Sequence, residues 1–256
     1  MSIELIHEGP VSIVTLNTPP MNLLEIETMD LLVDLHREAD AHPESRVIVT
    51  RSAVPNMFSN GLNPQYVLAM SPEARVDIFR AVGRMLHGLF SLGKPHIAVV
   101  NGPAMAGGAI LALTADFRLM EAEHGRLCFS EPKVGLPIPQ PVARIIAHFC
   151  LPAMLREVVL LGKNMDAHTA RETGLVDATA EGTEALEELV KNQVARLARL
   201  SPAVLRSTKA GMRSHLRELT AQFADDLGEF ANFTGPDFLG EGLTALMEQR
   251  HPIFKR

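Results

Sequence analysis

The sequence predicts an α/β protein whose C-terminal region is helical. Short β-rich runs at 3–7, 11–16, 47–49 and 97–100 alternate with segments at 25–41 and 72–92, whose apolar residues recur at helical spacing. The run at 97–100 passes through a glycine turn into an apolar helix that ends before Asp116, and the pattern after Pro139 is almost entirely helical. We therefore expect an α/β body over residues 1–182 and a helical region over residues 183–256.

The individual elements follow from turn and breaker residues. Glu8-Gly9-Pro10 separates the first two runs, which predicts an opening β-hairpin. Pro43 ends the first helix before the strand at 47–49. Two further strands are expected at 117–120 and 126–129, on either side of a polar turn at 121–125, and a short interruption of the helical stretch is expected at 175–177.

The composition argues against several classes of function. Hydrophobic residues make up 46% of the 256 residues, enough for a large core, so Cys128 and Cys150 are expected to be reduced thiols of a cytoplasmic protein. The net charge of −6 and the absence of long Lys/Arg blocks argue against a nucleic-acid partner. The His and Cys spacings predict no metal site, and we expect neither a signal peptide nor a membrane span.

The most informative motif is the strand-to-helix turn that contains Gly107 and Gly108. The first N–H groups of a helix lack intrahelical acceptors, and glycine lets another molecule approach the backbone closely. Such a turn can bind a phosphate or an oxyanion, although glycine can equally serve close packing of a helix against a sheet. The neighbouring segments 58–62 and 129–131 favour an oxyanion and acyl chemistry.

A second glycine turn, at Gly61, also follows an apolar strand. The N–H groups of Leu62 and Gly107 could therefore converge on one carbonyl oxygen. Two such donors form an oxyanion hole, in which each donor contributes on the order of 3 kcal/mol to stabilising an enolate.

Glu131 is the candidate general base. An isolated Glu is usually a solvated surface charge, but this one lies between the apolar strand at 127–129 and an apolar stretch at 134–139. Desolvation would raise its pKa toward neutrality, which suits proton abstraction. Ser59 and Ser130 lack a nucleophile-elbow motif, and Asp116 is expected to have a structural role.

Four ordered motifs resemble the crotonase (enoyl-CoA hydratase/isomerase) superfamily. They are Phe58-Ser-Asn-Gly-Leu62, the segment from Lys94 to Gly102, Ala106-Gly-Gly108 with Asp116, and the segment from Ser130 to Pro139. The resemblance implies a spiral of ββα units with a C-terminal helical region that mediates trimerisation. It also implies acyl-CoA thioester substrates, no cofactor apart from the coenzyme A of the substrate, and a homotrimer or a dimer of trimers.

The resemblance also assigns roles to residues. The oxyanion donors would be Leu62 and Gly107, and Glu131 would be the catalytic carboxyl. Hydratases of this family use two glutamates, but Ile110 stands at the first position, so the chain looks most like the Δ3,Δ2-enoyl-CoA isomerase branch. Expected substrate contacts, including those of the acyl tunnel, are Asn60, Gly61, Asn63, Tyr66, Met70, Lys94, Gly108, Ile110, Leu136, Phe254 and Lys255.

Three functions remain open from the sequence. The first is an isomerase that converts 3-enoyl-CoA to 2-trans-enoyl-CoA with Glu131 as a single proton shuttle. The second is a hydratase or related lyase in which Glu131 acts with an unidentified group. The third is a catalytically silent acyl-CoA-binding member of the fold. An alignment slipped by two residues would put Lys133 at the catalytic position, but Gly135-Leu136 favours Glu131.

Overall fold

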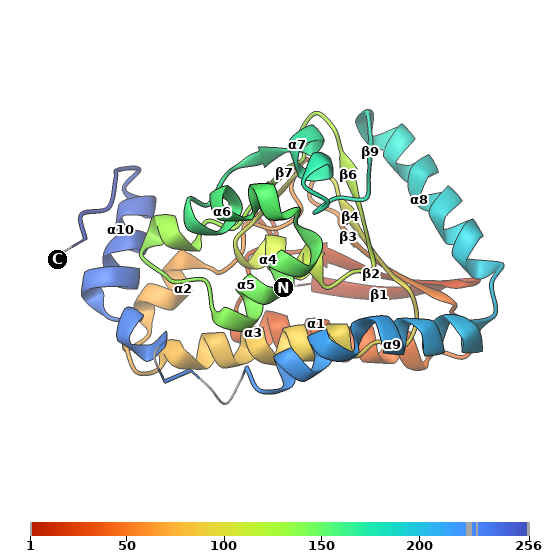
Figure 1. Ribbon diagram of the computed structural model, residues 1–256, viewed down its shortest axis with the longest axis horizontal. Helices are drawn as coiled ribbons and strands as arrows, with labels where there is room; N and C mark the ends of the chain where they lie inside the picture. The colour runs from red at the N-terminus through yellow and green to blue at the C-terminus, as the bar shows by residue number, and fades with distance from the viewer. Residues whose placement is uncertain (1, 224–226, 229, 255–256) are drawn as a thin grey trace.

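The computed structural model of the chain describes residues 2–223, 227–228 and 230–254. Its strands form two sheets that helices surround (Figure 1). The large sheet runs in the order β1 (Ser2–Glu8), β2 (Val11–Asn17), β3 (Val47–Ser52), β4 (His96–Val100), β6 (Phe117–Glu121) and β9 (Ala178–Ala180). Strands β1 and β2 form the predicted antiparallel hairpin, and the other neighbours pair in parallel.

The small sheet contains β5 (Pro103–Met105), β7 (Arg126–Cys128) and β8 (Met165–Asp166). Successive strands alternate between the two sheets: β4 lies in the large sheet and β5 in the small one before helix α4, and β6 and β7 repeat this order before helix α5. This succession is the predicted arrangement of ββα units.

The helices confirm the predicted periodicity, with small shifts at their ends. They are α1 (Ile26–Ala41), α2 (Pro64–Ala69), α3 (Arg75–Phe90), α4 (Gly107–Leu113), α5 (Gln140–Phe149), α6 (Pro152–Leu160), α7 (Ala167–Glu172), α8 (Gly182–Ala198), α9 (Pro202–Ala221) and α10 (Glu241–Met247). Shorter helical turns occur at η1 (Glu131–Val134), η2 (Phe230–Phe233) and η3 (Pro236–Gly240). The sequence did not predict β5, β8 or α2, because two to six residues are too short to show a period.

The large sheet has an apolar core on each of its faces. Val47 and Val49 of β3 face helix α8, whose Leu186 and Val190 belong to the same cluster. Ile48 points to the opposite face, where α1 packs against the strands and α3 packs against α1. Side chains alternate between the faces of a strand, so a strand covered on both faces needs a continuous apolar run. This explains the composition of β3 and β4.

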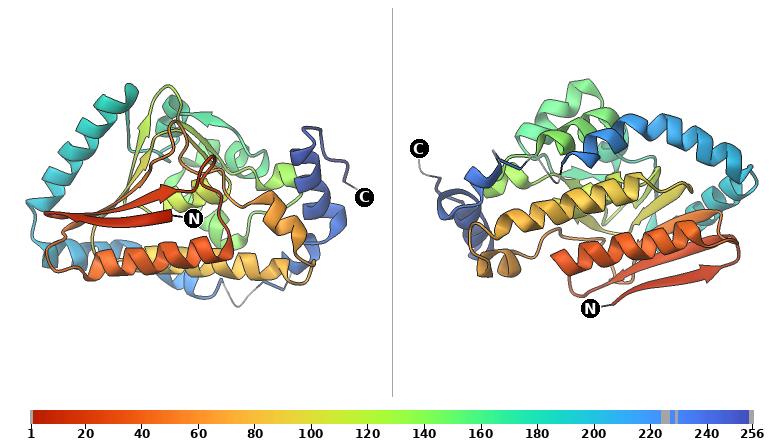
Figure 2. Two further views of the ribbon diagram at one scale, coloured as in Figure 1. Left: turned by 180° about the vertical axis from the view of Figure 1, so that it is seen from behind. Right: turned by 90° about the horizontal axis from the view of Figure 1, so that it is seen from below.

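The C-terminal region packs over the whole body. Helix α8 covers one face of the large sheet, and α9 lies along α3 (Figures 1 and 2). Helix α10 packs against α2 and η1 at the far end of the molecule. The boundary predicted near residue 182 therefore marks the start of α8, while the helices that follow contribute to the cores of the body. Across the described residues, none of the helices combines the length and apolar character that a membrane crossing requires.

Candidate active site

Three chain segments that lie in parallel bring the predicted catalytic residues together. Strands β5 and β7 pair with Ala104 opposite Leu127, and Ser59 forms a parallel bridge to Ala104 on the other side. Parallel segments in register end at the same edge. Leu62, Gly107 and Glu131 lie three or four residues beyond Ser59, Ala104 and Leu127, so this pairing delivers all three to one place.

Glycine is required where the first two segments meet. A Cβ atom at Gly108 would lie 2.2 Å from the Ser59 carbonyl oxygen. Gly61 has φ +77°, and a Cβ there would lie 2.9 Å from the Gly107 nitrogen. Ala106, just before α4, has φ 46° and ψ −119°, a conformation that is unfavourable for a residue with a side chain. The close approach of the turns thus depends on strained or glycine-only backbone.

The N–H groups of Leu62 and Gly107 have no hydrogen-bond acceptor among the residues that the structure describes. Gly61 O and Asn63 N are both bonded to Leu24, at 2.8 and 3.0 Å, and successive amides of an extended segment point in opposite directions. The Leu62 N–H therefore points away from Leu24. The two amides lie close together, since a Cβ at Gly107 would be 3.7 Å from the Leu62 nitrogen.

Both amides border a cavity of about 730 Å³. Its walls are largely apolar and come from five helices and the turns between them. The apolar lining includes Val67, Phe79, Val82, Ile110, Leu136, Val142, Leu239, Leu243 and Leu246. The exposed cations Lys133 and Arg250 and the exposed His251 also line it. The cavity thus combines an apolar chamber with positively charged groups.

Glu131 is the only carboxyl residue among the described residues that line this cavity. It is 6% exposed, and its Oε2 has no hydrogen-bond partner. Burial raises the pKa of the Glu131 carboxyl to about 7, partly opposed by a hydrogen bond from its own backbone N–H. A carboxyl with this pKa exchanges a proton readily near neutral pH.

Several of the other predicted substrate contacts lie at the site. The cavity is lined by Asn60, Ile110, Leu136 and Phe254, and the two turns are shaped by Gly61 and Gly108. Three other predicted contacts, Asn63, Tyr66 and Met70, lie outside the cavity lining. Asn63 caps α2, and the Tyr66 hydroxyl donates to Glu27 at 3.3 Å. Met70 packs against the core. Lys255 lies outside the described residues.

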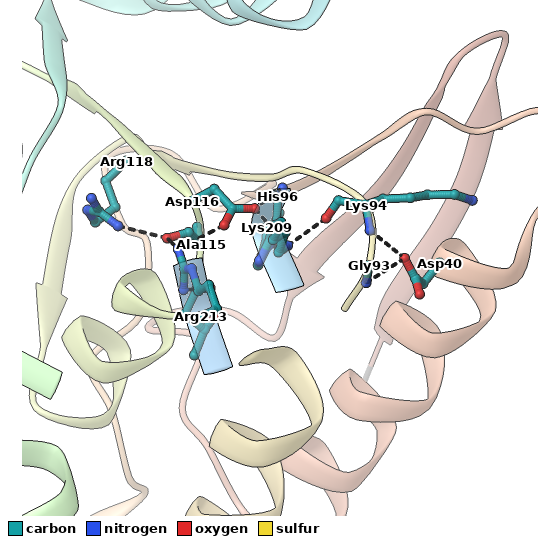
Figure 3. Close-up of polar contacts among 11 residues, drawn as sticks. Asp40, Gly93, Lys94, His96, Ala115, Asp116, Arg118, Lys209 and Arg213 are labelled. Atoms are coloured by element: carbon teal, nitrogen blue, oxygen red, sulfur yellow. Dashed lines mark hydrogen bonds and ion pairs between the residues drawn. The ribbon is translucent and has the colours of Figure 1, made fainter. Parts of the chain in front are cut away.

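The structure places Lys94 away from the cavity, contrary to the expectation that it contacts the substrate. Lys94 precedes β4, whereas the cavity lies beyond the other end of that strand. Its ammonium donates to the Ala39 and His42 carbonyls at 2.9 and 2.6 Å, and its backbone N–H donates to Asp40 (Figure 3). These bonds hold the end of α1 against the start of β4.

The sequence missed most of the cavity wall. Phe79 and Val82 were predicted as part of an apolar helix face, but periodicity does not say that the face borders a cavity. Leu239, Leu243 and Leu246 recur at helical spacing, which was a usable signal for a wall built by the C-terminal region. Asp116 has the expected structural role: it accepts a hydrogen bond from the His96 N–H and pairs with Lys209 and Arg213.

The structure also bears on two other kinds of chemistry, a serine nucleophile and a metal site. The Ser59 hydroxyl donates to the Asn22 carbonyl at 2.7 Å and is fully buried, which is unsuitable for a nucleophile. Glu121, Glu123 and His124 bring potential metal ligands together. The Glu121 carboxylate, however, already accepts hydrogen bonds from the backbone N–H groups of Glu123, His124 and Gly182, which explains its burial.

The fold is that of the crotonase superfamily. The crystal structure of human mitochondrial delta3-delta2-enoyl-CoA isomerase matches it with a TM-score of 0.89 at 22% sequence identity, over 96% of this chain and 97% of that one. An enoyl-CoA hydratase/carnithine racemase from Magnetospirillum magneticum matches with a TM-score of 0.78 at 27% identity, over 99% and 95% of the two chains.

Sequence comparison identifies the family. A putative enoyl-CoA hydratase from Thermus thermophilus is 30% identical over 257 residues, which cover 97% of this chain and 99% of the relative. Carnitinyl-CoA dehydratase from Salmonella typhimurium is 26% identical over 99% and 98% of the two chains. The model of the enoyl-CoA hydratase/isomerase family matches residues 7–256. The chain belongs to this enzyme family.

Proposed function

We propose that the protein is an isomerase that converts 3-enoyl-CoA thioesters to 2-trans-enoyl-CoA. The Glu131 carboxylate removes a proton from C2, and the electron pair passes to the thioester oxygen, which accepts hydrogen bonds from the Leu62 and Gly107 N–H groups. The same carboxyl returns the proton to C4 of the resulting dienolate, and the double bond then lies between C2 and C3. Protons and electrons balance without any added reactant.

The observation that carries this proposal is that Glu131 is the single carboxyl residue among the described residues that line the cavity. Moving a double bond needs one group that first accepts a proton and then donates it. Hydration needs, in addition, a group that holds and activates water, and Ile110 cannot do so at the position where this family's hydratases have a second glutamate. Apolar walls that exclude water also strengthen the hydrogen bonds to the enolate.

The chemistry of the cavity supports a coenzyme A thioester as the ligand. The apolar residues from α3 and α10 suit an acyl chain, and Lys133, Arg250 and His251 suit the anionic coenzyme. Phe254 lies at the same wall and offers a ring for stacking.

Turnover of a panel of 3-enoyl-CoA thioesters tests the proposal, with conjugation followed by absorbance. We expect wild-type protein to form 2-enoyl-CoA and Glu131→Gln to lose at least about a hundredfold in kcat, because the amide cannot accept the proton. CoA-thioester binding should persist in the variant. Full activity of Glu131→Gln would remove Glu131 from the mechanism.

Product analysis separates the alternative functions. A second candidate is hydration, which is favoured by the name of the Thermus thermophilus relative, a putative enoyl-CoA hydratase. Direct formation of 3-hydroxyacyl-CoA from 2-enoyl-CoA, with no isomerisation, would establish that reaction instead. Binding without turnover of 2-enoyl, 3-enoyl or dienoyl thioesters would indicate a silent acyl-CoA-binding protein.

A further inference from the structure

Helix α4, which begins at Gly107, has no polar side chain with which to fix its own position. Its sequence is Gly-Gly-Ala-Ile-Leu-Ala-Leu, and every residue is buried. Apolar packing involves no directional bonds, whereas hydrogen bonds to main-chain groups prefer a narrow range of distance and angle. The location of α4 along its axis therefore depends on the main-chain groups at its ends.

Arg213 binds those groups at the C-terminal end. Its Nη1 donates to the Thr114 carbonyl at 3.1 Å and its Nη2 to the Ala115 carbonyl at 2.7 Å (Figure 3). Arg118 donates to the same Ala115 carbonyl at 2.7 Å. The Arg213 side chain is 3% exposed and lies over the rings of Phe90 and Phe149. A planar guanidinium that contacts two rings and donates to two carbonyls gives this contact a fixed geometry.

Arg213 belongs to α9, about a hundred residues beyond α4 in the chain. Lys209 lies one turn earlier on the same buried face of α9. Both pair with Asp116, at 2.7 Å for Lys209 and 2.9 Å for Arg213. Lys209 differs in its second bond, because its Nζ donates to the Lys94 carbonyl at 2.6 Å, before β4, and makes no hydrogen bond to α4 among the described residues.

We propose that Arg213 is a positioning residue that holds the Gly107 N–H at its working distance from the Leu62 N–H. A seven-residue helix is about 10 Å long and moves as a rigid unit, so a shift at Thr114 and Ala115 reappears at Gly107. The segment that carries Leu62 is held by bonds to Leu24 and, through Ser59, to β5 ahead of α4, and none of these bonds involves Thr114 or Ala115. The proposal rests on the proposed function only in taking these two amides as the oxyanion donors.

The test compares Arg213→Met with Lys209→Met. Both substitutions remove one buried cation beside Asp116, but only the first removes a donor to the Thr114 and Ala115 carbonyls, of which Ala115 keeps its bond from Arg118. The probe is saturated butyryl-CoA labelled with ¹³C at the thioester carbonyl, whose infrared stretching frequency falls when the oxygen accepts hydrogen bonds. This readout needs no turnover, so it remains informative if the isomerase proposal fails.

We expect wild type and Lys209→Met to lower the bound carbonyl frequency equally, and Arg213→Met to lose at least half of that shift. For whichever reaction the wild type catalyses, kcat of Arg213→Met should fall about tenfold to a hundredfold while KM changes less than about threefold. Measurements are made well below the unfolding midpoints of both variants, so that loss of folded protein does not contribute.

A folded Arg213→Met with the full carbonyl shift and normal kcat would overturn the proposal. Equal losses in both variants would also overturn it, because the effect would then come from Asp116 or from general stability. If Arg213→Met does not fold, the same carbonyl measurement on Arg213→Lys tests the proposal. That variant keeps the charge beside Asp116 but cannot donate to both carbonyls in the fixed geometry of a guanidinium. It should lose part of the shift, and an unchanged shift would overturn the proposal.

Discussion

At the scale of single residues, the burial that suits Glu131 to its proposed role also lowers the stability of the folded protein. A carboxyl that is 6% exposed and has one oxygen without a partner is held in an environment that disfavours its charged form. That environment raises the pKa of the carboxyl to about 7, which is useful for shuttling a proton. The same desolvation makes the folded state less favourable once the group ionises.

Replacement of Glu131 by Gln should therefore stabilise the protein at high pH. Because the pKa of Glu131 is raised to about 7 from 4.5, the folded state binds more protons than the unfolded state between these values, and stability falls as pH rises through this range. The loss amounts to about 3 kcal/mol above pH 7, by the usual conversion of a pKa difference. Chemical denaturation at pH 5 and pH 8 measures it.

The gain from Glu131→Gln should thus be larger at pH 8 than at pH 5. Glu44→Gln, at an exposed position before β3, is the control and should change the free energy of unfolding little at either pH. A Glu131→Gln variant that is less stable than wild type at pH 8 would contradict the account of Glu131 as a desolvated carboxyl.

At the scale of elements, the site depends on how closely the segment at 58–62 approaches α4. Gly108→Ala would place a Cβ atom 2.2 Å from the Ser59 carbonyl oxygen, where only backbone can yield. The two segments must then separate, and the Leu62 and Gly107 amides with them. We expect a loss of roughly a hundredfold in kcat and a destabilisation of about 1–3 kcal/mol. Steady-state kinetics and thermal unfolding measure the two effects.

Gly211→Ala is the matched control for that prediction. Gly211 lies within α9, and a Cβ there would meet nothing within 4 Å. Alanine at an unobstructed helical position favours folding by up to about 1 kcal/mol, so this variant should be at least as stable as wild type and equally active. If both glycine variants were equally active, close approach at Gly108 would not be what holds the amides together.

Much of this arrangement was predictable from local sequence. Gly107-Gly108 and Glu131 each follow an apolar run within a few residues, and a glycine pair or an acidic residue at such a turn indicates a functional site. The hairpin, α1 and α3 followed from periodicity and turn residues. Such signals are local because they depend on which residues neighbour each other in the chain.

Contacts between distant segments were not predictable in this way. Lys209 and Arg213 are four residues apart on α9, and a pair of cations at that spacing is typical of a solvated face. Only the folded chain shows that this face meets Asp116 and the carbonyls after α4. The location of Lys94 could not be predicted for the same reason, since its sequence context does not reveal that its ammonium donates to two carbonyls at the end of α1.

At the scale of the whole molecule, the C-terminal helices complete the body rather than extend from it. Helix α8 covers one face of the large sheet, and α10 supplies part of the cavity wall. Arg213 of α9 donates to the carbonyls that follow α4. A Cβ at Gly242 of α10 would lie 2.1 Å from the Val134 carbonyl oxygen, so α10 rests directly on the turn that carries Glu131.

Helix α6 leaves large apolar side chains in solvent. Leu160 and Leu161 at its end are 67% and 68% exposed, and Leu151 at its start is 53% exposed. Exposed apolar groups of this size commonly mark a protein–protein interface. The trimer that the family resemblance implies would cover them if α6, in addition to the C-terminal helical region, lies between subunits, and we infer that it does.

Light scattering after size-exclusion chromatography tests this assembly. We expect wild-type protein to have the mass of three or six chains and the double variant Leu160→Glu/Leu161→Glu to have a smaller mass, because burying two carboxylates in an apolar interface is unfavourable. Leu31→Glu, at a 39% exposed position on α1, is the control and should leave the mass unchanged. A wild-type monomer, or a double variant that assembles like wild type, would exclude α6 from the interface.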